Sequence, residues 1–259
     1  MPIPNAVLPA VPQSTLTVRW ARSKEDRLRA QKLRALAFGF CPANTPESDI
    51  VPECDRFDPY ARHLIVVESG TGRCVGTYRL LDWSGAKKAG GFYTQTEFDL
   101  EPLSPFLPET LELGRSCVHP DYRNGGVIAL LWGALARMLK SGNVRFLMGC
   151  ASVDLTDPSL DPDRIWSYLR ENEWSHSLKN VTPHRPFPCL FRTEEKREAP
   201  ALPPLLKGYL RLGARCIGNP SHDPLFKTAD FPVWLPVDSM NDRYARHFFR
   251  ETKDNGRWS

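Results

Sequence analysis

The spacing of apolar and polar residues predicts a helix near the start of the chain. Ser23 is followed three residues later by Asp26, an arrangement that resembles a helix-capping box. Apolar side chains then recur at positions 28, 33, 36, 37 and 40, close to the spacing of one helix face. We expect this helix to end near Gly39 or at Cys41-Pro42, because glycine and proline commonly terminate helices.

Short β-rich runs and one long apolar run organise most of the remaining chain. Runs over 63–68 and 73–81 flank Ser-Gly-Thr-Gly, which predicts an antiparallel hairpin. A β-rich run over 111–118, an apolar stretch over 125–140 and a run over 144–151 predict strand, helix and strand. The other expected elements are a helix over 161–172, an apolar segment over 205–215, a strand over 231–237 and a short terminal helix.

Two stretches rich in proline or glycine interrupt these elements. Residues 44–60 form a polar excursion that carries Glu53, Asp55 and Asp58, and loops of that length often serve a site. Residues 84–110 are expected to be a crossing without regular structure. We expect a flexible arm over 1–15, a domain over 16–182, and an extension over 183–259 that packs on the domain or at a membrane surface.

Composition narrows the range of partners. The chain has 259 residues, a net charge of +4 and a pI of about 8.7. This charge is too weak to imply nucleic acid, but it is compatible with an acidic carrier protein or an anionic lipid surface. The seven cysteines contain no C-x-x-C pair, so we expect reduced thiols in the cytoplasm and no metal site. We expect no signal peptide, and no apolar run reaches the length of a membrane span.

Residues 111–131 combine features that suit acyl transfer from a thioester. The segment Arg123-Asn124-Gly125-Gly126 opens the long apolar helix, and the unpaired amides at a helix N-terminus attract anions such as a phosphate. An acyl thioester would then lie along the preceding strand. The alternative interpretation of Gly125-Gly126 is a tight turn between strand and helix.

Glu112 and Arg115 are the candidate catalytic residues of that strand. Strict alternation puts them on opposite faces, so they share a cleft only if the strand is bulged, for which Gly114 is well suited. A bulge would also free a backbone N–H to stabilise the thioester oxyanion. Glu112 would act as general base, directly or through water, and Arg115 could bind a carboxylate. The alternative is a purely structural salt bridge between the two residues.

The chain resembles known acyltransferases in the order and spacing of these residues. Strand, R-x-x-G-x-I, helix and strand resemble the GNAT-type acyltransferases, apart from Ile128, where a small residue is usual. The set Arg34 and Phe38, Glu53-x-Asp55-x-x-Asp58, Arg79 and Glu112-x-x-Arg115-x-x-Val118 resembles the signature of acyl-homoserine-lactone synthases. The forms E-L-G-R-S-C-V and A-L-L-W, and the tail with L-P-P-L-L-K-G-Y-L-R-L-G-A-R, resemble the bacterial N-acyltransferases that make lyso-ornithine lipid.

This resemblance implies an α/β (α+β) GNAT-like fold whose central, mostly antiparallel sheet is splayed at the acyl-donor site and flanked by helices. It implies transfer of a 3-hydroxyacyl chain from acyl carrier protein to the α-amine of L-ornithine by direct amine attack. No cofactor is expected, because phosphopantetheine arrives on the carrier protein. The residues that the resemblance assigns to the acyl donor are Ser116, Cys117, Val118, Arg123, Asn124, Gly125, Gly126 and Ile128.

The resemblance also suggests how the amino acid is bound. Asp55 and Asp58 would bind the distal ammonium of ornithine, Glu53 or Arg79 would orient them, and Arg34 would anchor their loop. Each of these is, alternatively, an ordinary surface charge. Cys117 is interpreted as a small core residue, since direct attack by the amine needs no acyl-cysteine.

Other functions stay open from the sequence. The acceptor could be glycine or another amino acid, the product could be an acyl-homoserine lactone, or the chain could be a non-catalytic acyl-carrier or lipid-binding protein. In the tail, Lys207, Arg211 and Arg215 recur every four residues, which on a helix gathers them into one stripe. That stripe predicts either a domain-packing helix or a peripheral contact with an anionic inner membrane.

Overall fold

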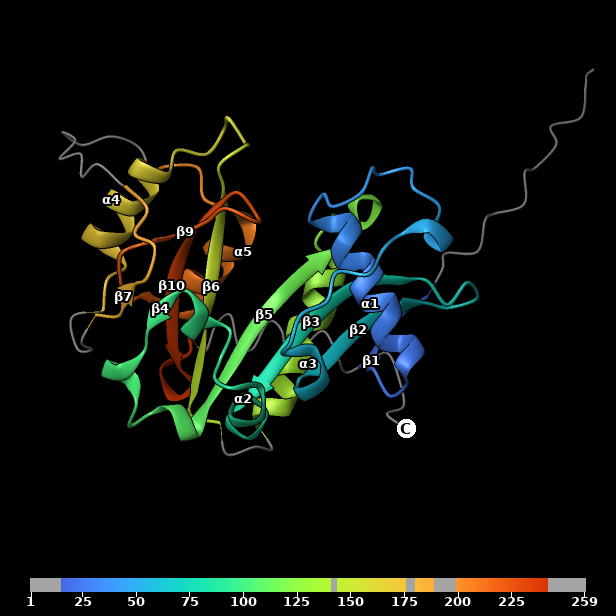
Figure 1. Cartoon of the computed structure of the whole chain (residues 1–259), viewed down its shortest axis with the longest axis horizontal. Coiled ribbons are helices and arrows are strands. Elements are labelled where there is room, and N and C mark those ends of the chain that lie inside the picture. Colours follow the sequence, from blue (N-terminus) through green and yellow to red (C-terminus); the bar gives the residue numbers. More distant parts are fainter. Residues whose placement is uncertain (1–14, 141–143, 176–179, 189–198, 242–259) are drawn as a thin grey trace, which may run out of the picture.

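The structure is a computed structural model that describes residues 15–140, 144–175, 180–188 and 199–241 (Figure 1). Within these residues no helix has the length and apolar character needed to cross a membrane. The expected terminal helix, and the expected flexible arm apart from position 15, lie outside the residues that the structure describes.

One sheet carries most of the strands. Its order is β1-β2-β3-β5-β6-β10-β8, and every neighbouring pair is antiparallel except β5 and β6. The prediction of a mostly antiparallel sheet is therefore confirmed. The strands on this path are β1 (Leu16–Trp20), β2 (Arg62–Glu68), β3 (Cys74–Asp82), β5 (Thr110–Val118), β6 (Phe146–Asp154), β8 (Arg215–Cys216) and β10 (Thr228–Pro236).

Three further short strands lie beside this path. β9 (Ser221–Asp223) pairs with β10 through a hairpin, whereas β4 (Phe98–Asp99) and β7 (Thr182–Pro183) form a separate two-stranded sheet. The residues assigned to a C-terminal extension thus supply β8, β9 and β10, which continue the sheet that begins with β1.

Helices cover both faces of the sheet. The α-helices are α1 (Lys24–Ala37), α2 (Trp83–Ala89), α3 (Gly126–Lys140), α4 (Pro162–Asn172) and α5 (Pro204–Leu212). The short 3-10 helices are η1 (Glu47–Asp49), η2 (Asp58–Tyr60), η3 (Thr94–Thr96), η4 (Glu101–Leu103), η5 (Leu107–Glu109), η6 (Pro120–Tyr122) and η7 (Val237–Ser239). The Ser23 side chain accepts a hydrogen bond from the Asp26 amide, so the predicted start of α1 is confirmed.

The alternation along β2 separates two layers of core. Leu64 and Val66 pack with the α3 residues Val127 and Leu131, whereas Ile65, between them in sequence, packs under α1. Since successive side chains of a strand point to opposite faces, α1 and α3 sandwich the strands between them, as Figure 1 shows.

β5 and β6 separate after three paired residues. Their parallel register runs from Thr110↔Phe146 to Glu112↔Met148 and ends there. In Figure 1 the two strands lie together at one end and diverge toward the other. This divergence is the splayed sheet that the resemblance predicts, and it divides the sheet into two halves that share one closed end.

The sequence misses some elements. Residues 84–110, expected to be an irregular crossing, contain α2 after its first residue together with η3, η4 and η5. The segment 205–215 is helical only as far as Leu212, because Gly213 adopts a left-handed φ of 105° and ends α5. Arg215 belongs to β8, so the expected stripe of three cations on one helix is wrong.

Candidate active site

The acidic loop is fastened to the sheet by a buried arginine of α1. Arg34, which is 0% exposed, binds Asp58 with its two terminal nitrogens at 2.6 and 2.8 Å. Its Nε donates to the Glu53 carboxylate, and Nη2 donates to the Glu53 carbonyl at 2.8 Å. Burial alone would raise the pKa of Asp58, but hydrogen bonds and charge from Arg34 hold that pKa well below its usual value.

Two arginines of the sheet complete this ion network. Arg79 on β3 contacts Asp55 at 2.6 Å and Asp58 at 3.3 Å. Arg115 on β5 contacts Glu53 at 3.2 Å and Asp55 at 3.0 Å. Three cations therefore balance three carboxylates among the residues Arg34, Glu53, Asp55, Asp58, Arg79 and Arg115. The structure brings all five predicted amino-acid-binding residues together with Arg115, in a set whose charges are already matched.

A bulge in β5 brings Arg115 to the face that carries Glu112. The register passes from Cys117↔Thr77 to Gly114↔Arg79, so β5 has one more residue than β3 in this interval. The expected bulge is thus present, but the unusual backbone belongs to Arg115, whose φ is 48°, rather than to Gly114. Because of this extra residue, Cys117 packs under α1 although Leu113 packs toward α3.

Glu112 is 3% exposed and holds the turn that begins η3. Its carboxylate accepts hydrogen bonds from the Tyr93 amide at 2.9 Å, the Thr94 amide at 2.7 Å and the Thr94 hydroxyl at 2.6 Å. Burial raises the pKa of Glu112, while these hydrogen bonds from Thr94 and Tyr93 oppose the shift.

Tyr93 links Glu112 to Arg115. The Arg115 guanidinium lies 4.4 Å from the centre of the Tyr93 ring and 4.8 Å from the Phe226 ring. Among the described residues, Glu53 and Asp55 are the ion-pair partners of Arg115, so the two candidate catalytic residues do not form the alternative salt bridge. They meet through one aromatic residue that no sequence motif singled out.

The residues assigned to the acyl donor follow the bulge. The Arg123 Nε donates to the Val118 carbonyl at 3.3 Å, and the Asn124 side chain accepts from the Gly126 amide at 3.1 Å. Gly125 has a left-handed φ of 92°, which is easily adopted by glycine, and Gly126 is the first residue of α3. This geometry presents the helix N-terminus at an exposed turn, as an anion site requires.

The other three acyl-donor candidates are less exposed. Cys117 lies in the core beneath α1, where burial raises the pKa of its thiol, as expected of a core residue. The Ser116 hydroxyl is buried without a hydrogen-bond partner among the described residues. Ile128 is half-buried at the edge of the core cluster of α3.

An apolar pocket opens where β5 and β6 diverge. Leu113 and Gly149, the residues just beyond the last parallel pair, contribute to its wall. From α3, Trp132 and Leu135 line this pocket as well. The other lining residues are Tyr78, Ala136, Leu139, Leu147, Met148, Cys150, Tyr209, Leu212, Ala214, Val233, Trp234, Leu235 and Met240.

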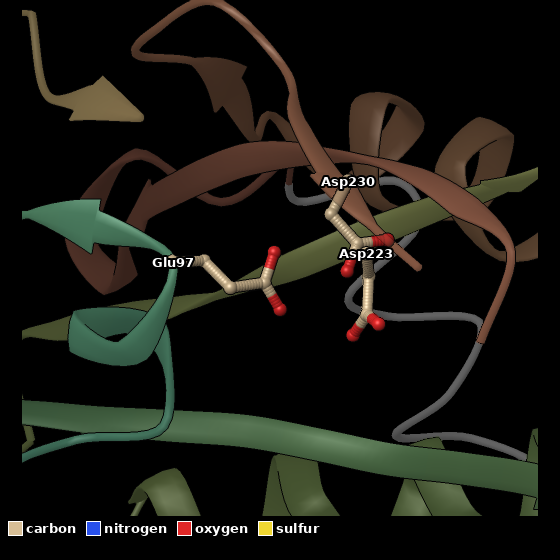
Figure 2. A group of neighbouring side chains, drawn as sticks. All are labelled: Glu97, Asp223 and Asp230. Atoms are coloured by element: carbon tan, nitrogen blue, oxygen red, sulfur yellow. The ribbon is translucent and has the colours of Figure 1, made fainter. Parts of the chain in front are cut away.

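Sequence reasoning missed a second acidic group near this pocket. Glu97, Asp223 and Asp230 come from the turn before β4 and from the β9–β10 hairpin, and Figure 2 shows their carboxylates turned toward one another. The available signal was Asp230 itself, an acidic residue inside the apolar strand Thr228–Pro236. Nothing in the sequence indicates that Glu97 lies beside it.

Comparisons with known proteins were made for the sequence and for the fold. A family model described as an acetyltransferase (GNAT) domain matches residues 33–133. The L-ornithine N(alpha)-acyltransferase of Rhodobacter capsulatus is 31% identical over 252 residues, which cover 92% of this chain and 96% of the relative. The protein of the same name from Rhizobium meliloti is 32% identical over 278 residues, covering 95% and 87%.

Solved structures share the fold at much lower identity. The AHL synthase LasI matches with a TM-score of 0.50 and 13% identity, over 90% of this chain and 96% of that one. FeeM, an N-acyl amino acid synthase from uncultured soil microbes, also has a TM-score of 0.50, with 12% identity over 87% and 93%. These two matches establish the kind of fold.

Proposed function

Because the chain belongs to the L-ornithine N(alpha)-acyltransferase family, we propose that it transfers a 3-hydroxyacyl chain from acyl carrier protein to the α-amine of ornithine. The chain is an acyltransferase, and its product is an N-acylated ornithine. The carrier protein as donor and the hydroxylated chain are the parts of the proposal that need a test.

The observation that carries this proposal is the apolar pocket at the divergence of β5 and β6. Its lining is almost entirely hydrocarbon, so it suits a long acyl chain, whose burial contributes about 0.8 kcal/mol for each methylene group. On β5 the lining of the pocket begins at Leu113, one residue beyond Glu112, and we assign the acyl carbonyl to the bulged part of this strand.

The turn before α3 is the part of the molecule that we assign to the donor's phosphopantetheine arm. We assign its phosphate to the amides that begin this helix, with exposed Arg123 beside them, because the helix dipole and an arginine both favour an anion. A carrier protein with an acidic surface would approach the same turn, whereas coenzyme A would bring additional phosphates. We therefore expect the surface around the turn before α3 to decide whether the enzyme uses a carrier-protein thioester or a coenzyme A thioester.

The reaction itself needs one proton acceptor and one oxyanion donor. The ornithine α-amine, once deprotonated, attacks the thioester carbon; the C–N bond forms, the C–S bond breaks, and the thiolate leaves and is protonated. We assign proton removal to Glu112, through a water molecule, because burial raises the pKa of this carboxyl above its usual value, against the opposing hydrogen bonds from Thr94 and Tyr93. An N–H of the bulge at Arg115 would stabilise the oxyanion.

The network around Arg115 is assigned to positioning the ornithine carboxylate. Its ion pairs with Glu53 and Asp55 use Nε and Nη2, so Nη1 is the atom proposed to bind the carboxylate. Arg34 and Asp58 hold the loop beneath this contact.

Turnover with defined donors and acceptors tests the proposal. The purified protein would be incubated with 3-hydroxyacyl carrier protein, the matching acyl coenzyme A, and ornithine, glycine, lysine or S-adenosylmethionine, with products read by mass spectrometry. We expect acylornithine from the carrier-protein thioester, at a higher rate than from coenzyme A. Acylation of glycine alone, formation of a homoserine lactone, or binding without turnover would support the competing functions.

A further inference from the structure

The acidic group at Glu97, Asp223 and Asp230 differs from the loop network in its lack of cations. One carboxylate oxygen from each residue lies within 4.8 Å of the others, and the residues are 1%, 6% and 3% exposed respectively. Among the described residues, none of the three forms an ion pair with a lysine, arginine or histidine. In Figure 2, Glu97 points toward the two aspartates from the turn before β4.

Several of these oxygens also lack a hydrogen bond. Both oxygens of Glu97, the Oδ1 of Asp230 and the hydroxyl of Thr228 are buried without a hydrogen bond of ordinary geometry among the described residues, although Tyr93 and Asp230 lie close enough to Glu97 to influence its pKa. The Asp223 carboxylate, in contrast, accepts from the Tyr93 hydroxyl at 3.3 Å and from two amides of its own turn. Burying an unpaired carboxylate costs several kcal/mol, so Glu97 holds a proton unless a cation takes its place, and the facing carboxyls of this group suit a cationic ligand.

The group lies next to the proposed reaction centre. Tyr93 connects the two, because its hydroxyl contacts Asp223 and its amide contacts Glu112 at 2.9 Å. Cys150 provides a second connection, because it lines the acyl pocket and its thiol lies 3.8 Å from the Thr94 hydroxyl. Burial raises the pKa of this thiol, and the nearby Glu97, Asp230 and Glu112 raise it further.

We propose that Glu97, Asp223 and Asp230 bind the side-chain ammonium of ornithine. This inference rests on the proposed function and adds the site that distinguishes ornithine from amino acids with uncharged side chains. An alkylammonium has three N–H donors and, with a pKa near that of lysine at about 10.4, stays cationic while the α-amine reacts. The two nitrogens of extended ornithine are about 6 Å apart, which one tyrosine ring can span.

The loop acids are less suited to this task. Asp55 and Asp58, which the sequence assigned to the ammonium, already neutralise Arg34, Arg79 and Arg115. Adding an ammonium there would break existing ion pairs, whereas adding one between the three unmatched carboxylates creates new ones.

Substrate preference tests the assignment. The variants Glu97→Gln and Asp230→Asn would be compared with wild type using ornithine and norvaline, which has the same carbon chain without the ammonium. We expect the ratio of kcat/KM for ornithine to that for norvaline to fall by on the order of a hundredfold in each variant, mainly through KM. Glu101→Gln, which removes an exposed carboxylate four residues after Glu97, is the matched control and should keep the wild-type ratio.

Thermal melting supplies an independent readout. Ornithine should raise the Tm of wild type and of the control, but not of Glu97→Gln, which should itself melt no lower than wild type because glutamine is neutral and does not have to take up a proton on folding. Variants that keep the ornithine preference and the ornithine-induced Tm shift would overturn the assignment. So would stabilisation by Mg²⁺ or Ca²⁺ that depends on Glu97 while ornithine has no effect. A wild-type enzyme that acylates other amino acids but not ornithine would instead refute the proposed function.

Discussion

At the scale of single residues, the environment of each buried carboxylate decides its protonation. Asp58 is ionised because Arg34 lies against it, and the pKa of Asp58 is low. Glu97 is buried beside Asp230 without a cation, and burial followed by that neighbouring charge raises the pKa of Glu97 to about 9. In the folded protein at neutral pH, Asp58 is therefore ionised and Glu97 is protonated, although nothing in the sequence distinguishes the two acids.

Replacing Glu112 with glutamine tests its proposed role as base. Glu112→Gln should lower kcat by roughly two to four orders of magnitude, the usual range for a lost general base. The acidic limb of the pH–rate profile should disappear with it. Thr94→Val is the matched control: it removes one hydrogen bond to the ionised carboxylate and should shift that limb to higher pH while keeping it. A full acidic limb in Glu112→Gln would assign the carboxylate to holding η3.

The acidic group also predicts how stability depends on pH. Glu97 holds its proton in the folded protein up to about pH 9 but loses it near 4.5 when unfolded, so the free energy of unfolding should fall as pH rises between those values. Each such proton gives a slope of about 1.4 kcal/mol per pH unit. The groups that face Glu97 are Tyr93, Cys150, Asp223 and Asp230.

Urea unfolding at several pH values measures this slope. The difference between wild type and Glu97→Gln isolates the Glu97 contribution from other groups that titrate in the same range. Between about pH 6 and about pH 9, the free energy of unfolding should fall less steeply with pH in the variant than in wild type. The two slopes should differ by about 1.4 kcal/mol per pH unit, the value for one proton. Parallel curves for the two proteins would contradict the raised pKa of Glu97.

Residue roles were only partly accessible from the sequence. The resemblance identified all members of the ion network, because their local spacing survives in this chain, but it could not tell that their charges cancel. Glu97, Asp223 and Asp230 were missed because Glu97 lies more than a hundred residues before the two aspartates and meets them only through β9 and β10. Periodicity reports which face a residue occupies, and it cannot report which distant strand will face it.

At the scale of elements, the divergence of β5 and β6 depends on how closely their backbones approach just beyond the last paired residues. A Cβ on Gly149 would lie 2.4 Å from the Leu113 carbonyl oxygen, so only glycine lets β6 pass β5 at this point. The bounds predicted for the described helices and strands agree with the structure to within three residues, provided that Gly39 rather than Cys41-Pro42 is taken as the predicted end of α1. The short elements α2 and β9 were missed because their sequences carry no clear apolar period, whereas β1 was missed although Leu16, Val18 and Trp20 alternate with polar residues.

The α3 wall of the pocket should set the acyl length. Ala136→Phe would fill part of the pocket and lower activity with long chains relative to short ones. Excluding two methylene groups removes about 1.6 kcal/mol of burial, so the ratio of rates for long and short thioesters should change at least about tenfold. Ala129→Phe, on the same helix outside the pocket lining, should leave the ratio unchanged; an unchanged ratio in Ala136→Phe would place the chain elsewhere.

At the scale of the whole molecule, the exposed cations on α5 are the part of the positive net charge that could contact an anionic membrane. Lys207 and Arg211 lie exposed on α5, the helix whose buried face packs on β6 and β10. Arg215, placed by the sequence on the same stripe, instead contacts Glu173 at 3.0 Å from β8. A peripheral contact with an anionic membrane would therefore rest on the two helical cations.

Vesicle binding tests that contact. Lys207→Gln combined with Arg211→Gln should weaken co-sedimentation with anionic vesicles at low salt by roughly thirtyfold, at about 1 kcal/mol for each charge. Turnover on soluble substrates should persist. Arg215→Gln is the control and should sediment like wild type, because its charge is already paired. Equal binding of the double variant and wild type would exclude α5 as the electrostatic anchor.

The pairing of β6 with β10 has a consequence for how the protein is made. Residues 155–227 separate the two strands, and β5 covers only the first part of β6 on its other side. On a ribosome that adds about 5–20 residues each second, β10 is synthesised several seconds after β6, and until then most of the backbone hydrogen-bonding groups of β6 are unpaired. An exposed edge of this kind is a template for pairing with other chains, so the nascent enzyme passes through an aggregation-prone stage that the folded one does not have. Asp223 and Asp230 lie on the same hairpin, so the folding step that pairs β10 with β6 also completes the acidic group. A chain that stops before this step would be prone to aggregate and would lack the site proposed to select its substrate.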